Sequence, residues 1–207
     1  LLSLDETVIL SPDLAAIFAQ LQSSGYSMTP SQLKKVLNHN WGDDWLKHFK
    51  YFDVRPFAAA SIGQVHKATL KSGEVVAIKV QFPGVKQSID SDLATLKFMM
   101  KTSGMLPANF PLEHYISQCG DLLKRETNYE LEAENINLFS GFLNGSKVIH
   151  VPKVYNKLST DQTLTMSFLE GRELSNIMNF DQSVRDEISL HLIQLLFNEI
   201  FNFRMVQ

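Results

Sequence analysis

The chain has 207 residues, of which 44% are hydrophobic and 20% charged, and its 19 basic and 22 acidic residues give a formal net charge of −3. This composition is globular and excludes disordered, low-complexity and collagen-like classes, and the absence of a basic excess argues against a nucleic-acid partner. The apolar runs are too short for a membrane span, no signal peptide is visible, and the single cysteine, Cys119, excludes an internal disulfide, as fits a reducing compartment.

The first fifty residues are expected to form amphipathic helices. Ser11-Pro12-Asp13 indicates a helix start, because a hydroxyl cap, a proline at the first helical position and an acid near the positive end of the dipole occur together. Thr29-Pro30-Ser31-Gln32 repeats this signal with capping-box spacing. A third short helix is predicted at residues 41–49.

Strands are predicted after this helical part. Residues 57–70 and 74–82 are rich in Val, Ile and Ala, and Lys71-Ser72-Gly73 between them indicates a hairpin turn. Because side chains alternate along a strand, Ala77 and Lys79 are expected to share one face of the second strand.

The rest of the chain is predicted to be mostly helical. A helix capped by Ser88 is followed by a long helix over about 112–143, by two strands at 148–155 and 163–168, and by a buried helix that includes 184–196. This order of elements predicts an α+β fold with a small antiparallel sheet.

Two neighbouring motifs suggest a nucleotide site. Val76-Ala77-Ile78-Lys79 matches the kinase signature in which a strand lysine holds nucleotide phosphates. The preceding stretch, Ala58 to Val65, occupies the place of the glycine-rich loop, with alanines at its first two glycine positions and Gly63 at its third. Small side chains allow backbone amides to approach phosphate oxygens, although small residues in a strand can also serve close packing alone.

A phosphate-binding lysine needs a carboxylate partner that holds it charged and oriented. Four glutamates of the predicted long helix compete for this role, namely Glu126, Glu130, Glu132 and Glu134. Helical periodicity does not choose among them, because acidic residues on a helix commonly form its solvated face.

These segments resemble the UbiB (aarF) family of atypical protein-kinase-like proteins. The resemblance rests on Ala58–Val65, on Val76–Pro83 with its continuation to Gly84-Val85, and on Glu126-Thr-Asn-Tyr-Glu-Leu-Glu132. It implies an alanine-rich loop in place of the glycine-rich one. It also implies helices inserted between Lys79 and Glu132, which are 53 positions apart.

The resemblance implies three parts within a kinase-like fold. Residues 1–50 would be a helical N-terminal extension that packs over the cleft. Residues 51–168 would be the small lobe, with a helical insert at about 85–111, and residues 169–207 would be the exit from the hinge and the start of a large lobe. The chain is then expected to be a fragment, with the catalytic Asp, Asn and metal-binding Asp of the family beyond Gln207.

Site residues follow from the resemblance position by position. Lys79 would be the nucleotide lysine and Glu132 its partner, while Glu126 and Asn128 would contact the extension, with asparagine standing where the family has aspartate. Met166 takes the gatekeeper place and is followed by the hinge, and Glu170 is a candidate for a ribose contact. The implied nucleotide-binding residues are Ala58, Ala59, Ala60, Ser61, Gly63, Val65, Ala77, Lys79, Met166, Ser167, Phe168 and Leu169.

The resemblance also implies the function of the parent protein. It would bind ATP or ADP, with Mg²⁺ held by ligands outside this chain, and support ubiquinone or related isoprenoid-quinone biosynthesis by ATP hydrolysis or phosphoryl transfer. A nucleotide-sensing pseudokinase and a small-molecule phosphotransferase of kinase fold are the alternatives. Expected partners are nucleotide, quinone-biosynthesis proteins or lipid at a membrane surface, and a second copy of the isolated chain. The expected location is intracellular, in a bacterial cytoplasm or a mitochondrial or plastid interior.

Overall fold

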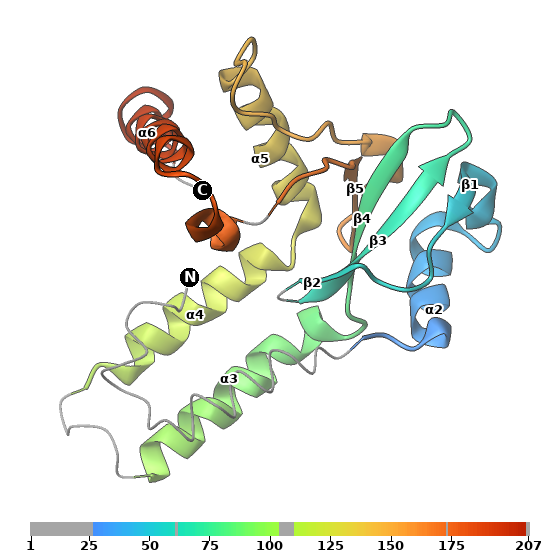
Figure 1. Cartoon of the computed structure of the whole chain (residues 1–207). Helices are drawn as coiled ribbons and strands as arrows, with labels where there is room; N and C mark the ends of the chain where they lie inside the picture. Colours follow the sequence, from blue (N-terminus) through green and yellow to red (C-terminus); the bar gives the residue numbers. More distant parts are fainter. Residues whose placement is uncertain (1–26, 61, 104–109, 173, 206–207) are drawn as a thin grey trace.

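The computed structural model describes residues 27–60, 62–103, 110–172 and 174–205 (Figure 1). The helix predicted to start at Ser11 lies outside these residues, as does Ser61 of the alanine-rich stretch.

A five-stranded antiparallel sheet forms the centre of the fold, and the two longest strands, β3 and β4, pair along most of their length. The strands β1 and β2 pair one after the other with β3, and β5 pairs with β4 on its other side. The predicted hairpin turn joins β3 to β4, with Gly73 at a φ of 94°, which favours glycine. The strands are β1 Phe49–Phe52, β2 Ala58–Ala60, β3 Gly63–Leu70, β4 Val75–Gln81 and β5 Thr163–Ser167.

One face of the sheet is covered by helix α2, Pro30–Trp41 (Figure 1). The predicted capping box is confirmed, since Thr29 accepts a hydrogen bond from the Gln32 backbone while the Gln32 side chain accepts from the Thr29 backbone. Alternation along β4 then divides its side chains between the two faces. The apolar set packs with α2 in the main core, which includes Leu33, Val36, Leu37, Val76, Ile78 and Val80.

Helices α3, Val85–Thr102, and α4, Leu112–Glu126, lie side by side and extend away from the sheet (Figure 1). Helix α5, Tyr129–Phe142, packs against β5, and α6, Gln182–Phe197, continues into a π-helical turn, Asn198–Phe203. Short 3₁₀ helices occur at Trp45–His48, Asn156–Leu158 and Leu174–Asn179. The fold is therefore α+β, as predicted.

Two predictions about helices in the first half of the chain were wrong. Residues 41–49 do not form one helix, because Phe49 begins β1 and packs against Trp45 in the core with ring centroids 6.1 Å apart. Helix α3 starts at Val85 rather than at a cap on Ser88, whose hydroxyl donates to the Val85 carbonyl.

Two predictions in the second half of the chain also need correction. The expected strand at 148–155 is reduced to a single bridge between Val154 and Met166. Pro152 explains this, because it has no N–H to donate to a ladder. The expected helix over 112–143 is broken between α4 and α5 at Thr127 and Asn128.

The predicted C-terminal helix is present, but its apolar side chains are not buried within this chain. Leu192, Leu196 and Ile200 are 44%, 47% and 45% exposed. Among the described residues, no helix has both the length and the apolar character needed to cross a membrane.

Candidate functional site

Lys79 and Glu132 form a bidentate ion pair between the sheet and α5. The Lys79 Nζ donates to both carboxylate oxygens of Glu132, at 2.9 Å and 2.8 Å. The two side chains are 19% and 36% exposed, so the pair is only partly screened by solvent. The amine is therefore held in a fixed position while remaining partly accessible to an anion.

The break between α4 and α5 decides which glutamate meets the lysine. Glu126 is the last residue of α4 and lies outside the helix that packs on β5. Glu130 and Glu134 are on α5 but point to solvent, whereas Glu132 is half-buried and faces β4. The choice that the sequence left open is thus made by the rotation of α5.

Tyr129 belongs to this site but was not expected from the sequence. Its ring centroid lies 4.7 Å from the Lys79 Nζ, and the side chain is fully buried. Burial raises the pKa of Tyr129, and the nearby charges of Glu132 and Glu126 raise it further, so its hydroxyl stays neutral. The signal that could have found it is spacing, because Tyr129 and Glu132 are i and i+3 on one helix.

A cavity of about 610 Å³ lies beside the end of β5. It brings together five of the predicted nucleotide-binding residues, which are Ala77, Met166, Ser167, Phe168 and Leu169. Ala77 and Met166 are directly paired between β4 and β5. Glu170 lines the same cavity.

The sequence did not single out two other residues of this cavity. Lys67 places its Nζ 4.0 Å from the centroid of the Phe168 ring, and the ring of Phe57 meets Phe168 edge-on with centroids 5.6 Å apart. Side-chain alternation along β3 could have identified Lys67, because it lies on the same face of the strand as Val65, a predicted nucleotide-binding residue.

A second cavity, of about 700 Å³, adjoins the ion pair. Lys79 and Glu132 line it together with Arg125, Glu126 and residues of α4 and α5. Because Ala77 and Lys79 lie on the same face of β4, both cavities open along that face.

The three alanines of the alanine-rich stretch form strand β2, which pairs with the start of β3. Ala58 pairs with Val65, Ala59 with Gln64, and Ala60 with Gly63. Val65 in turn pairs with Lys79 across β3 and β4, so the hairpin is fixed in register with the lysine.

Asn128 has a local role in the described structure. Its side-chain oxygen accepts a hydrogen bond from the Leu131 backbone at 3.2 Å and so caps α5. Glu126 lines the second cavity. Contact of either residue with the extension, residues 1–50, stays a prediction, and residues 1–26 of that extension lie outside the described part of the chain.

A buried chain of hydrogen bonds supports the hairpin from the opposite face of the sheet. The Met28 backbone donates to Gln64 Oε1 at 2.7 Å, Gln64 Nε2 lies 2.7 Å from His66 Nε2, and His66 Nδ1 lies 2.9 Å from the Asp53 carbonyl. A carbonyl only accepts, so His66 Nδ1 carries the proton and Nε2 accepts from the amide. The network therefore requires a neutral imidazole.

Stability should depend on pH through His66. Burial lowers the pKa of His66 from its ordinary value of 6.5, against smaller opposing effects of the hydrogen bond to Asp53 and its charge. Below pH 6.5 the unfolded chain binds a proton that the folded chain resists, so the free energy of unfolding should decrease as the pH falls through this range. Urea unfolding between pH 5 and pH 7.5 measures this. An equally steep dependence in His66→Gln would contradict the assignment.

The described residues contain no group of three or more His, Cys, Asp or Glu side chains placed to hold a metal. Cys119 is exposed on α4.

Comparisons with known proteins place the chain in a family. A family model described as "ABC1 atypical kinase-like domain" matches residues 20–207. The chain is 37% identical over 207 residues to "Atypical kinase COQ8, mitochondrial" of Saccharomyces cerevisiae and 36% identical to "Atypical kinase coq-8, mitochondrial" of Caenorhabditis elegans. Each alignment covers the whole of this chain, but only 41% and 27% of those relatives.

A solved structure is similar as well. The structure of the complex of Rv3197 with erythromycin from Mycobacterium tuberculosis matches with a TM-score of 0.71 and 26% identity, over 92% of this chain and 49% of that one. The chain thus spans less than half of each of these three proteins.

Proposed function

The chain belongs to the ABC1 atypical kinase-like family, as its resemblance to UbiB proteins predicted, and from this premise we propose that it forms the nucleotide-binding part of an atypical kinase. The observation that carries the proposal is the Lys79–Glu132 ion pair, placed on the same face of the sheet as the cavity at the end of β5.

The cavity is proposed to hold the base of ATP or ADP. Ala77 and Met166 line it, and both are apolar, so a flat ring can lie against the small alanine and the adaptable methionine. The backbone of Ser167 to Leu169 follows β5 directly and would read the edge of the base. Apolar walls with a few convergent polar groups are typical of cofactor sites, and this supports the assignment.

Lys79 is proposed to bind the phosphates. An ammonium group held by one carboxylate and lying over an aromatic ring loses little freedom when a phosphate approaches. Glu132 would orient the amine, and Tyr129 would shield it from water on one side. The hairpin from Ala58 to Val65 would cover the nucleotide, with its two strands held in register with Lys79.

Magnesium would neutralise phosphate charge when bound, as in other phosphoryl-transfer proteins. The ligands that the family resemblance places beyond Gln207 are proposed to hold it. The part described here then supplies base recognition, one fixed cation and its partner.

We further propose that the intact protein uses ATP, by hydrolysis or phosphoryl transfer, in ubiquinone or related isoprenoid-quinone biosynthesis. The support is the family and its relatives, two of which carry the word mitochondrial in their names. Quinone-biosynthesis proteins or lipid at a membrane surface are the proposed partners, and a mitochondrial interior is the proposed location.

Filling the cavity tests the assignment of the base. Ala77→Leu places a larger side chain in the lining of the cavity, so ADP affinity of the intact protein should fall about tenfold or more, in line with the 1–3 kcal/mol that overpacking commonly costs. Ala94→Leu, on the exposed surface of α3, is the matched control and should bind as the wild type does. Equal affinity of Ala77→Leu and the control would place the base elsewhere.

A further inference from the structure

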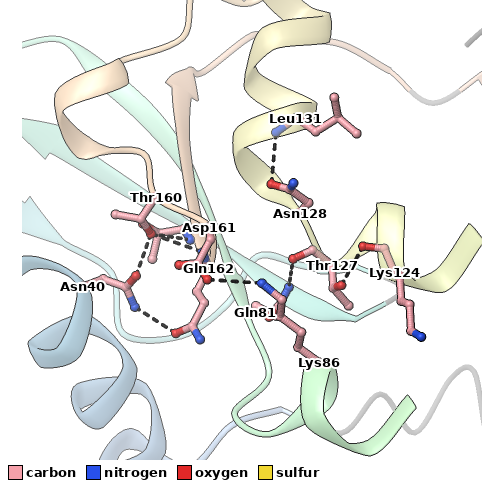
Figure 2. A network of polar contacts seen from close by, with 11 residues as sticks. Asn40, Gln81, Lys86, Lys124, Thr127, Asn128, Leu131, Thr160, Asp161 and Gln162 are labelled. Atoms are coloured by element: carbon pink, nitrogen blue, oxygen red, sulfur yellow. Dashed lines mark hydrogen bonds and ion pairs between the residues drawn. The ribbon is translucent and has the colours of Figure 1, made fainter. Parts of the chain in front are cut away.

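The backbone hydrogen bonds change partners where α4 meets α5. In a continuous helix the Leu131 N–H would donate to the carbonyl of Thr127, four residues earlier. Here it donates instead to the side chain of Asn128, at 3.2 Å (Figure 2). The Thr127 carbonyl is thereby free to accept a hydrogen bond from outside the helix.

Gln81 is the donor that uses this carbonyl. Its Nε2 lies 3.0 Å from the Thr127 oxygen, and the two residues are 2% and 1% exposed (Figure 2). A hydrogen bond so well shielded from water is strong, and losing its donor leaves a buried carbonyl unsatisfied. Gln81 is the last residue of β4, two positions after Lys79 on the same face of the strand.

The turn before β5 also binds both the end of β4 and the start of α5. The Gln81 N–H donates to the carbonyl of Gln162 at 3.0 Å, and the Tyr129 N–H donates to the carbonyl of Asp161 at 3.3 Å. Helix α2 joins this network, since Thr160 donates to Asn40 Oδ1 at 2.6 Å and Asn40 Nδ2 to Gln162 Oε1 at 3.2 Å (Figure 2).

We propose that Gln81 is a positioning residue that fixes α5 against β4 and thereby holds Glu132 on Lys79. Two links then join the same strand to the same helical segment: the amide of Gln81 to Thr127, and the ammonium of Lys79 to Glu132. These two links to β4 act together with the packing of α5 on β5 and the Tyr129–Asp161 hydrogen bond, and they set the distance and rotation of the start of α5 relative to Lys79. Asn128 contributes to the same arrangement, because its side chain caps α5 and so leaves the Thr127 carbonyl available to Gln81.

The chemistry of the residue fits this role. A glutamine brings a neutral donor on a side chain long enough to reach across from the strand, without the desolvation cost of a buried charge. The role in nucleotide binding rests on the proposed function, but the effect on α5 does not.

The first test is amide hydrogen exchange in the intact protein without nucleotide. Gln81→Met keeps the length and flexibility of the side chain and removes its donor. Amides in the first turns of α5, residues 131–134, should exchange at least about tenfold faster, because the helix opens locally. Gln64→Met is the matched control, since Gln64 is also a 2% exposed amide on the sheet but bonds to Met28 and His66 rather than to α5.

A second pair of variants keeps the test decisive if Gln81→Met folds poorly. Asn128→Ala removes the cap and should speed exchange at the same α5 amides, while Asn128→Asp retains an acceptor and should not. Unchanged α5 exchange in Gln81→Met, or equal acceleration in Gln64→Met, would overturn the proposal.

A double-mutant cycle then tests whether Gln81 affects nucleotide affinity through Glu132. Gln81→Met should lower ADP affinity about threefold to tenfold in the wild-type background and cause no further loss in a Glu132→Ala background, which already lacks the contact with Lys79 that Gln81 is proposed to position. Additive losses would mean that Gln81 does not act through Glu132. Unchanged affinity in Glu132→Gln and in Lys79→Ala would instead reject the proposed function, while hydrogen exchange would still decide the role of Gln81.

Discussion

Lys79→Ala is expected to weaken ADP and ATP binding to the intact protein by about ten- to a hundredfold, because one hydrogen bond to a charged group contributes roughly 1.5–3 kcal/mol. The substitution removes the cation and also leaves the Glu132 carboxylate, which now lies 2.8 Å from the amine, without its counter-charge. An uncompensated negative charge beside the phosphates should add to the loss.

Glu132→Gln should cost less, because the amide oxygen still accepts a hydrogen bond from Lys79 while the charge is lost. Lys86→Ala is the control, since Lys86 is an exposed lysine of α3 that lies 3.6 Å from Asp161. Calorimetric titration measures all three variants. An unchanged affinity in Lys79→Ala would contradict the phosphate role.

Gly63→Ala is expected to produce the largest loss of stability. A Cβ at this position would lie 2.3 Å from the Val80 carbonyl oxygen and 3.0 Å from the Tyr129 hydroxyl, so the neighbouring strand would have to move. Overpacking of this kind costs about 1–3 kcal/mol, and the backbone contact places Gly63→Ala toward the upper end. The third glycine position of the loop is therefore required by packing against β4 and α5, independently of any phosphate.

Gly141→Ala is the matched control for this substitution. Gly141 lies within α5, and a Cβ there would meet no atom within 4 Å. Because Gly141 is the last residue but one of α5, alanine should raise the free energy of unfolding by at most about 0.5–1 kcal/mol, the value for a helix interior. Urea unfolding of the two variants should thus move the midpoint in opposite directions. A Gly63→Ala protein as stable as the wild type would contradict the close packing of β3 on β4.

Local signals in the sequence predicted the elements that depend on neighbouring residues. The capping box at Thr29 and the glycine turn at Gly73 are of this kind, since each needs only a few adjacent residues to form. Phe49 was placed in a helix because helical spacing was continued past Trp45. Its aromatic neighbours in the folded core instead favour a strand, and that contact joins residues from separate elements.

The break between α4 and α5 was missed from the sequence, which led to the prediction of a single helix over about 112–143. The polar run at residues 124–128 interrupts the apolar pattern there, but polar residues also occur on the solvated face of a continuous helix. Asn128 is an ordinary cap residue, but the Thr127 carbonyl that it releases is satisfied by Gln81, which lies 46 positions before Thr127 in the sequence. No pattern within the helix contains that information.

Some residues of the candidate site could be predicted from the sequence and others could not. Lys79 is indicated by its motif, and the resemblance to a known family selected Glu132 from four glutamates. Tyr129, Lys67 and Gln81 were missed, because each contributes through a contact between elements rather than through a motif.

A crystal structure of the intact protein with ADP would test the central claim most directly. The base is expected against Ala77 and Met166, beside the backbone of Ser167 to Leu169, with a phosphate oxygen within hydrogen-bonding distance of the Lys79 Nζ and the Lys79–Glu132 pair retained. Nucleotide bound away from β4, or bound with Lys79 out of reach of every phosphate oxygen, would contradict the account.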